Sequence, residues 1–543
     1  MTDEEKQKDR SIESATMLGW LQLQGLKLSS STKQRLAELR RANPNWKPEW
    51  DEHAARSHDG AGGIVRNEPD PGSLMDVPLA NVIQVATEKT HSPFGELVSY
   101  RPFDGFVATR PARAVSALTH ASRRGHYPIQ FWNSVLTNLP DHASLRLRIV
   151  LAERIARLPE SIILELRFEL FMWVKKNLRI VAASDLERSL RLFDELSDKL
   201  LVHSSLGTQS GFGTRSIGGR PVKTSRRTFE HAINSPIGHC AQLLLDILKD
   251  LKPDEGRGIP DSIRTRLLRL TQSPGEGRDH AVGIIAQSVP YLYWLDPDWT
   301  KQNALPWFDL QDECAEPAWN GYVFYGRLPQ QELFSLIKPH FLALFGRLSG
   351  WHWDHQCTQK MHQLLVQASL PRRSRRYISF ADAKSALQAT DDSGRGLSLG
   401  YLVQILKEDR KWWKKFVRPF LNEAWPRELN CQTEFTSTQF ARLPEAAGES
   451  FPQVVDTICP LLTPVSRLLH IRHLVQGRPA NDTTPFSARF PNHTLKLLHA
   501  LIPDDPPYAP YQLEKLLNLI ADSAPMLRQD SRWIRLHRIA VGT

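Results

Sequence analysis

Cysteine is scarce in this chain, and the cysteines that it has lie far apart. No two of them form a CxxC pair, the spacing that thiolate zinc knuckles and redox dithiols require. The sequence therefore predicts neither kind of site. It predicts reduced thiols, as in cytoplasmic proteins, at Cys240, Cys314, Cys357, Cys431 and Cys459.

Long apolar runs are also missing. A membrane-spanning helix needs about 18 apolar residues, and the most apolar stretch, 162–174, is interrupted by Glu165, Arg167 and Glu169. The first residues, MTDEEKQKDR, are strongly charged and unlike the n-region of a secretory signal. We therefore expect a cytoplasmic protein that makes no membrane contact.

Two glycine-rich stretches approach nucleotide-binding motifs without completing them. The loop GFGTRSIGGR (211–220) has the glycines of a phosphate-binding loop, but the lysine and the metal-binding hydroxyl that should follow Gly218 are missing. The turn GAGGI (60–64) has Ile64 where the NAD-binding turn of sirtuins has a serine. Neither HExxH nor any other complete catalytic constellation emerges, so we predict a chain that is not an enzyme and uses no cofactor.

The densest group of possible metal ligands is WHWDHQC (351–357). His352, His355 and Cys357 could gather around an ion. His362 lies two turns further along the helix, on the face of His355. A helical pair of histidines supplies only two ligands, and Cys357 points elsewhere. The prediction is a helix start packed by aromatic rings, with no metal site.

Helical periodicity is what the sequence has in abundance. In 144–158, leucine, isoleucine and valine recur at steps of three and four residues, which places them on one face of a helix. Similar runs follow to the end of the chain, and the 37 prolines mostly mark the breaks between them. GYVFYG (321–326) is the best strand candidate. The pattern predicts an all-α fold, a multi-helix array of solenoid-like stacked helical pairs with long connecting loops.

A chain of 543 residues is too long for one compact core. Connectors rich in proline, glycine or serine divide it, the clearest being 203–228, with another near 390–397. The predicted parts are a charged N-terminal segment with helices and a Pro/Gly-rich linker (1–73), an N-terminal helical domain (74–202), a flexible linker (203–228), a central helical domain (229–390) and a C-terminal helical domain (397–543).

The net charge of +10 is a mild excess that permits an acidic partner. PRRSRRY (371–377) lies in a break between predicted helices, and RKWWKKFVRPF (410–420) mixes cations with rings, a combination that contacts phosphates and stacks on bases. The rings of 410–420 also follow helical spacing, which indicates a core face with the lysines outward. The candidate nucleic-acid-binding residues are Arg372, Arg373, Arg375, Arg376, Lys411, Lys414 and Lys415.

Several sequence segments within 228–345 and 409–502 resemble segments of a known helical region, in their residues and in their order. Among them are HAINSPIGHCAQLLLDIL, YWLDPDWTKQNALPWFD and FPQVVDTICPLL. This part of the chain resembles the C-terminal helical domain found behind a sirtuin-like NADase domain in bacterial antiphage defence proteins. The resemblance implies a helical sensor or scaffold of a defence system, with any NAD chemistry in another polypeptide, and it carries over no catalytic residue.

Three functional hypotheses follow. The first is a non-enzymatic scaffold that recognises a phage component or a partner subunit. The second is a nucleic-acid-binding accessory subunit that uses the arginine and lysine patches. The third, an enzyme assembled from residues distant in the sequence, stays open because one sequence does not reveal such a site.

Overall fold

The computed structural model describes the chain in segments that form two compact units. The units are Met1–Arg154 and Ile155–Thr543, and each is described by itself. The finer five-part division predicted from the connectors stays a prediction. The described residues are 3–23, 25–43, 66–92, 98–202, 205–213, 216–217, 220–221, 223–324, 326–371, 376–466 and 484–542.

The described α-helices of the first unit have 8 to 21 residues, and its described residues also contain one pair of short strands. Its elements are α1 (Asp3–Leu23), α2 (Ser30–Ala42), β1 (Arg66–Glu68), α4 (Val82–Lys89), β2 (Val98–Tyr100), α5 (Pro102–Thr109), α6 (Pro111–Arg123), α7 (Ile129–Asn138) and α8 (Leu145–Ala156), which crosses into the second unit.

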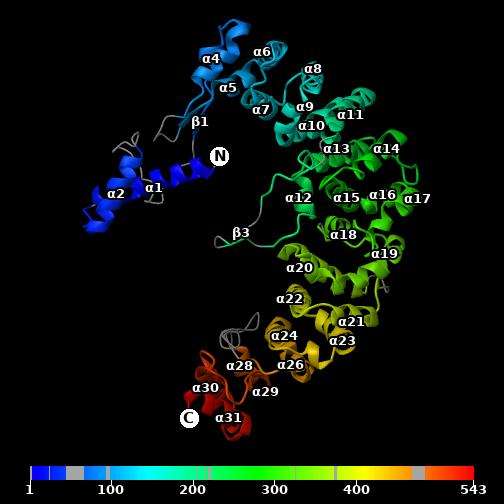
Figure 1. Cartoon of the computed structure of the whole chain (residues 1–543). Coiled ribbons are helices and arrows are strands. Elements are labelled where there is room, and N and C mark those ends of the chain that lie inside the picture. The colour runs from blue at the N-terminus through cyan, green and yellow to red at the C-terminus, as the bar shows by residue number, and fades with distance from the viewer. Residues whose placement is uncertain are drawn as a thin grey trace. The chain divides into compact units, whose positions relative to one another are not determined.

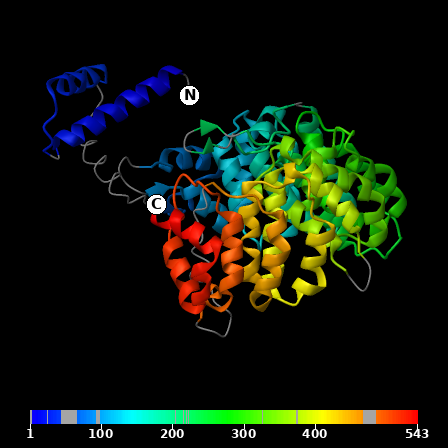
Figure 2. The same cartoon turned by 90° about the horizontal axis from the view of Figure 1, so that it is seen from below.

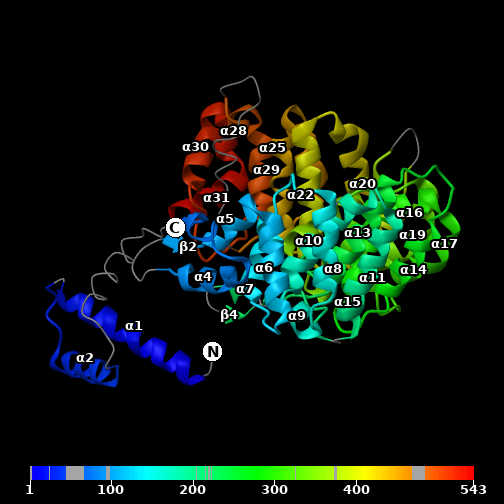
Figure 3. The ribbon, with the colours of Figure 1, turned by 90° about the horizontal axis from the view of Figure 1, so that it is seen from above.

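Helices α5, α6 and α7 pack against one another in this unit (Figure 3). Strands β1 and β2 pair in parallel, with Arg66 opposite Val98. Helices α1 and α2 form a hairpin with a small core of its own around Leu36 and Leu39.

The second unit is a long succession of helices. They are α9 (Glu160–Glu165), α10 (Arg167–Ala182), α11 (Leu186–Val202), α12 (Phe229–Ile233), α13 (Pro236–Asp250), α14 (Asp261–Leu270), α15 (Gly277–Gln287), α16 (Val289–Leu295), α17 (Pro297–Asn303), α18 (Ala315–Val323), α19 (Gln331–Ala343), α20 (His355–Ser369), α21 (Phe380–Ala389), α22 (Asp392–Glu408), α23 (Arg418–Glu423), α24 (Glu434–Phe440), α25 (Leu443–Ala447), α26 (Phe451–Ile458), α28 (Phe486–Arg489), α29 (Pro491–Leu501), α30 (Leu513–Ser523) and α31 (Ser531–Val541). Its described strands are the short β3 (Ser216–Ile217) and β4 (Arg220–Pro221).

Each helix of this unit packs on helices that are close to it in the chain (Figure 1). Helix α13 contacts α15, α15 contacts α18, α18 contacts α20, and α20 contacts α22. Figure 2 shows the yellow, orange and red helices near the C-terminus side by side in chain order. This confirms the predicted all-α, solenoid-like array of stacked helices.

One continuous apolar core holds together the part of the second unit from α15 onward. It runs from Val282 in α15 to Leu536 in α31. Large aromatic side chains fill it, and Trp319, Trp413 and Trp425 are almost fully buried. Successive amphipathic helices bury their apolar faces against one another, which is the arrangement that a solenoid uses in place of a central core.

The strand predicted at 321–326 is wrong. Residues Ala315–Val323 form helix α18. Trp319, Tyr322 and Val323 are buried in the core, and Trp319 Nε1 donates a 3.0 Å hydrogen bond to the Phe308 carbonyl. A short aromatic and β-branched run fits a strand locally, and here tertiary packing overrides that preference.

The connector predicted at 390–397 is also largely helical, since α22 begins at Asp392. Asp391 caps this helix by accepting a 2.8 Å hydrogen bond from the Gly394 nitrogen. Gly394 is required by close packing, because an added Cβ would lie 2.4 Å from His362 Cε1 of α20. The buried guanidinium of Arg395 donates to the carbonyls of Leu387 (3.1 Å) and Thr390 (2.6 Å) at the end of α21.

Helices α15 and α18 pack closely at Gly321 of α18. A Cβ on Gly321 would lie 2.0 Å from the Gly283 carbonyl oxygen, and neither backbone can yield without separating the helices. Gly400, in the interior of α22, would meet nothing within 4 Å.

We expect Gly321→Ala to destabilise the second unit by about 1–3 kcal/mol, the usual effect of overpacking a core. Gly400→Ala is the matched control. Because alanine is the better helix former, it should raise the stability by up to about 1 kcal/mol. Circular dichroism during thermal unfolding compares the two variants. Equal midpoints would contradict the close approach.

Candidate functional site

The segment between α11 and α12 forms a folded arm. The arm comprises residues 205–213, strands β3 and β4, and residues 223–228. Strands β3 and β4 pair antiparallel, with Ser216 opposite Pro221. Figure 1 shows β3 on a loop that runs away from α12. The sequence predicts a flexible linker here, and the structure holds both described ends of the arm by specific bonds.

Arg226 attaches the arm to the start of α15. Its guanidinium forms a two-pronged ion pair with Glu276, in which Nη2 lies 3.0 Å from Oε2. Arg226 Nη1 also donates to the Phe212 carbonyl at 2.8 Å, and the Ser210 nitrogen donates to Glu276 Oε2 at 3.2 Å. The two ends of the arm are thus joined to each other and to one carboxylate.

Arg227 makes a second attachment, to both α15 and α18. Its guanidinium donates to the Asp279 carboxylate at 2.7 and 2.9 Å and lies 3.7 Å from Glu316. Ser225 Oγ donates to Glu316 at 2.5 Å. Paired bonds between an arginine and a carboxylate are among the strongest and most directional that side chains form.

The three carboxylates gather where helices begin. Glu276 occupies the N-cap position of α15 without a capping bond from its side chain, Asp279 lies in the first turn of that helix, and Glu316 lies in the first turn of α18. Negative charge is favourable at a helix N-terminus. Burial raises the pKa of Glu316. Burial acts in the same direction on Glu276, but the bonds from Arg226 and Ser210 outweigh it and hold the pKa of Glu276 below its usual value.

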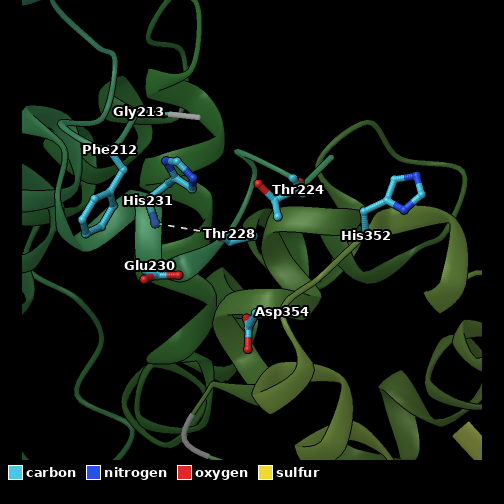
Figure 4. A pocket seen from close by; sticks show the side chains of 9 residues that line it. Phe212, Gly213, Thr224, Thr228, Glu230, His231, His352 and Asp354 are labelled. Carbon is cyan, nitrogen blue, oxygen red and sulfur yellow. Dashed lines mark hydrogen bonds between the residues drawn. The ribbon is translucent and has the colours of Figure 1, made fainter. Parts of the chain in front are cut away.

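A pocket of about 390 Å³ opens between the arm and the starts of α12 and α20. Phe212 and His231 lie together on one side of it, with their rings edge to face at 5.8 Å, and His352 lies on the other side (Figure 4). Its lining residues are Phe212, Gly213, Thr224, Ser225, Thr228, Glu230, His231, His352 and Asp354. Thr228 and Asp354 are also the N-caps of α12 and α20.

His231 is the most perturbed titratable group in this pocket. Burial, reinforced by the positive charge of Arg226, lowers its pKa to about 4, so the imidazole is neutral near pH 7. Its Nδ1 lies 2.5 Å from Ser210 Oγ. Ser210 is buried and is not among the residues that line the pocket. Arg226 Nη2 also donates to the Ser210 Oγ at 3.3 Å. Ser210 therefore belongs to the residues whose hydrogen bonds and ion pairs hold the two described ends of the arm in place. We call these residues, Ser210, Phe212, Ser225, Arg226 and Arg227, the bonded base of the arm.

The histidines and the cysteine around the helix start predicted at 351–357 differ in their exposure. His352 and His355 are exposed, whereas Cys357 and His362 are buried. Cys357 Sγ accepts a hydrogen bond from Asn320 Nδ2 at 3.3 Å. Across the described ranges, no three His, Cys, Asp or Glu side chains lie close enough together to hold a metal ion.

A GxSxG pattern also occurs in this chain, at GLSLG (396–400). In hydrolases such a serine stands exposed on a strand-to-helix turn. Here Ser398 lies inside α22, is fully buried, and has its Oγ 3.4 Å from His362 Nδ1. The pair is a contact between α20 and α22 in the core, out of reach of a substrate.

The structure describes the second predicted basic patch and one arginine of the first. Arg372, Arg373 and Arg375 lie outside the described residues. Lys411, Lys414 and Lys415 are exposed, and Trp413, Phe416 and Phe420 are buried, which confirms the predicted core face. Arg376 is exposed and lies over the Phe380 ring at 3.8 Å, and that ring contacts Phe416 and Phe420. Packing therefore brings Arg376 to the lysine-bearing segment.

Sequence reasoning missed the bonded base of the arm. Arg226 and Arg227 stand in TSRRTFE without any notable motif around them. The only local signal is an arginine pair directly before a helix-capping threonine. Their carboxylate partners come about 50 to 90 residues later, so the pairing depends on how α15 and α18 pack.

No protein-family model matches the sequence, and no curated protein matches it. One solved structure matches, a "circular tandem repeat protein with novel repeat topology and enhanced subunit contact surfaces". The identity is 12% and the TM-score 0.14, over 98% of this chain and 94% of that chain. A TM-score this low carries no argument about the present chain. None of the helices in the described part combines the length and apolarity that a bilayer crossing needs.

The pKa of His231 predicts loss of stability in acid. The folded protein keeps this imidazole neutral down to about pH 4, whereas an unfolded histidine takes up a proton near pH 6.5. The stabilisation is complete above pH 6.5 and is lost as the pH falls towards 4. The thermal midpoint should therefore decrease over this interval.

His231→Asn should make this decrease shallower, because one fewer group takes up a proton on unfolding. Ser210→Ala leaves the imidazole in place and should keep the wild-type slope. Scanning calorimetry in buffers from pH 4 to 7.5 measures both variants. An unchanged slope in His231→Asn would show that His231 is not buried in its neutral form.

Proposed function

We propose that this protein is a non-enzymatic helical scaffold that recognises a protein partner through the arm. The observation that supports this proposal most is that the same arm is held by specific bonds and carries exposed apolar residues. The side chain of Leu206 is 57% exposed and that of Phe212 is 41% exposed. Exposed aromatic and aliphatic side chains on a held loop are suited to serve as anchors in a partner's pockets.

The bonded base supports this function energetically. Binding costs conformational entropy when a mobile loop must become ordered. Here Arg226 and Arg227 hold both described ends of the arm in place before any partner arrives. The stacked helices add a long surface of the kind that solenoid proteins use for protein recognition.

The place of this scaffold in the cell rests on the sequence resemblance. We assign it to the cytoplasm, as a sensor or scaffold subunit of a bacterial antiphage defence system, where its partner is a companion subunit or a phage protein. The resemblance to the helical region of sirtuin-like defence proteins supports this assignment.

Substitution of the exposed apolar residues tests the proposal. In cells that carry the gene with its neighbours, we expect Leu206→Ala combined with Phe212→Ala to reduce partner retention at least tenfold, since two anchors together contribute more than about 1.4 kcal/mol. Met172→Ala, at a side chain 60% exposed on α10, is the matched control and should retain the partner.

Quantitative mass spectrometry of the purified chain measures retention, and plaque counts measure protection from phage. Wild-type retention in the double variant, or no partner on the wild type in infected cells, would overturn the scaffold function. Equal plaque counts with and without the gene would overturn the defence assignment alone.

A second candidate function is nucleic-acid binding, favoured by the approach of Arg376 to the segment with Lys411, Lys414 and Lys415. These cations are exposed, and phosphate contacts by such residues give binding that weakens with salt. The buried rings of Trp413 and Phe416 are not accessible to bases, so this binding would be electrostatic and independent of sequence.

Charge reversal tests this second function. Lys411→Glu, Lys414→Glu and Lys415→Glu together should lower the slope of log affinity against log salt by about 3, about one for each lost phosphate contact. The control changes three exposed lysines elsewhere, Lys33, Lys89 and Lys515, to glutamate, with the same change in net charge. Filter binding of duplex DNA and of RNA measures both. If the slope falls equally in the two triple variants, the attraction depends on net charge alone and not on Lys411, Lys414 and Lys415.

A further inference from the structure

A second pocket lies at the opposite ends of α15 and α18 from the arm. Its volume is about 610 Å³, within the range of small-molecule sites. We call it the Tyr322 pocket. It is lined by Lys249, Gln287, Ser288, Pro290, Tyr291, Tyr322, Arg327, Leu328, Pro329 and Gln330.

The hydroxyl of Tyr322 is buried. The residue is only 5% exposed, and among the described residues its Oη has no hydrogen-bond partner. Burial raises the pKa of Tyr322 far above its usual value, so the hydroxyl keeps its proton and can donate. Buried hydroxyls nearly always have a partner, and Tyr322 is one of the residues that line the pocket.

Two unpaired cations line the same pocket. Lys249 and Arg327 are exposed, and no hydrogen bond or ion pair of either side chain occurs within the described part of the chain. No carboxylate is among the lining residues. The pocket therefore favours an anion near its solvent-exposed cations and a neutral acceptor near the buried hydroxyl.

The remaining wall is apolar and held in place. Pro290, Tyr291 and Leu328 supply flat or aliphatic surface. Gln330 Nε2 donates to the Pro290 carbonyl at 3.3 Å, and Tyr377 Oη donates to the Pro329 carbonyl at 2.8 Å. These bonds fix segment 326–330 against the helices, so the pocket exists before a ligand enters.

We propose that the Tyr322 pocket binds a small anionic molecule with a planar ring. The ring lies against Tyr291 and Pro290, a ring oxygen or nitrogen accepts the Tyr322 hydroxyl, and Lys249 and Arg327 bind the anionic group. A nucleoside monophosphate and a ring carboxylate share this chemistry. The site is independent of the arm, and its failure would leave the scaffold proposal untouched.

Titration calorimetry with the whole chain tests the site. The probes are adenosine and uridine monophosphates, the corresponding nucleosides, orotate and inorganic phosphate. We expect one of the ring anions to bind, and to bind at least tenfold more tightly than the nucleosides or phosphate alone. A monophosphate that binds while orotate does not identifies a phosphate ligand, and the reverse identifies a carboxylate ligand. Absence of binding by every probe at millimolar concentration would overturn the proposal.

Substitutions test which residues of the pocket bind the anionic probe. Arg327→Gln and Lys249→Gln should each weaken binding of the anionic probe about tenfold, whereas Arg442→Gln, an exposed arginine outside the pocket, should not. Tyr322→Phe should weaken binding about fivefold and leave the thermal midpoint of the free protein unchanged or higher, because it removes an unpartnered hydroxyl.

Tyr377→Phe is the matched control for that hydroxyl. It deletes a hydrogen bond that is made in the free protein, so it should lower the thermal midpoint. If Tyr322→Phe lowers the midpoint and leaves the affinity unchanged, the hydroxyl is structural and the proposed ligand contact is wrong. Unchanged affinity in both Arg327→Gln and Lys249→Gln would place any binding elsewhere.

Discussion

The close packing of α15 on α18 is the contact on which the central part of the second unit depends. Gly321 lets the two backbones meet, since any side chain there would collide with the Gly283 carbonyl of α15. This contact brings the starts of both helices together, where Asp279 and Glu316 receive Arg227. It also places Gln287 and Tyr322, at their other ends, in one pocket wall. One helix pair thus organises both the arm and the Tyr322 pocket.

The two ends of this helix pair differ in charge, and the difference follows from the helices themselves. Helix starts favour carboxylates, and these in turn attract the arginines of the arm. At the other end, Lys249 and Arg327 find no carboxylate in the pocket wall. At the first end the charges are paired within the chain and hold the arm in place, whereas no carboxylate lines the pocket at the second end.

Local pattern and tertiary packing disagree at two informative places. GYVFYG has the composition of a strand, and DDSGRG has that of a loop, yet both lie largely within helices. In the first, aromatic side chains gain more from burial in the helical core than from pairing with a strand. In the second, Asp391 caps the helix and Arg395 satisfies the carbonyls of the preceding one. Both causes involve residues distant in space or bonds that composition does not reveal.

The sequence by itself determined that this chain is an array of amphipathic helices, because a spacing of three and four residues places apolar side chains on one helix face wherever it occurs. It likewise determined that most of the rings of 410–420 are buried and the lysines exposed. Only the tertiary structure decided which carboxylates meet Arg226 and Arg227, and that Arg376 packs on the Phe380 ring. It also decided that the Tyr322 hydroxyl has no hydrogen-bond partner among the described residues. Those outcomes depend on how separate helices pack, and contacts between residues far apart in the chain leave no periodic trace in the sequence.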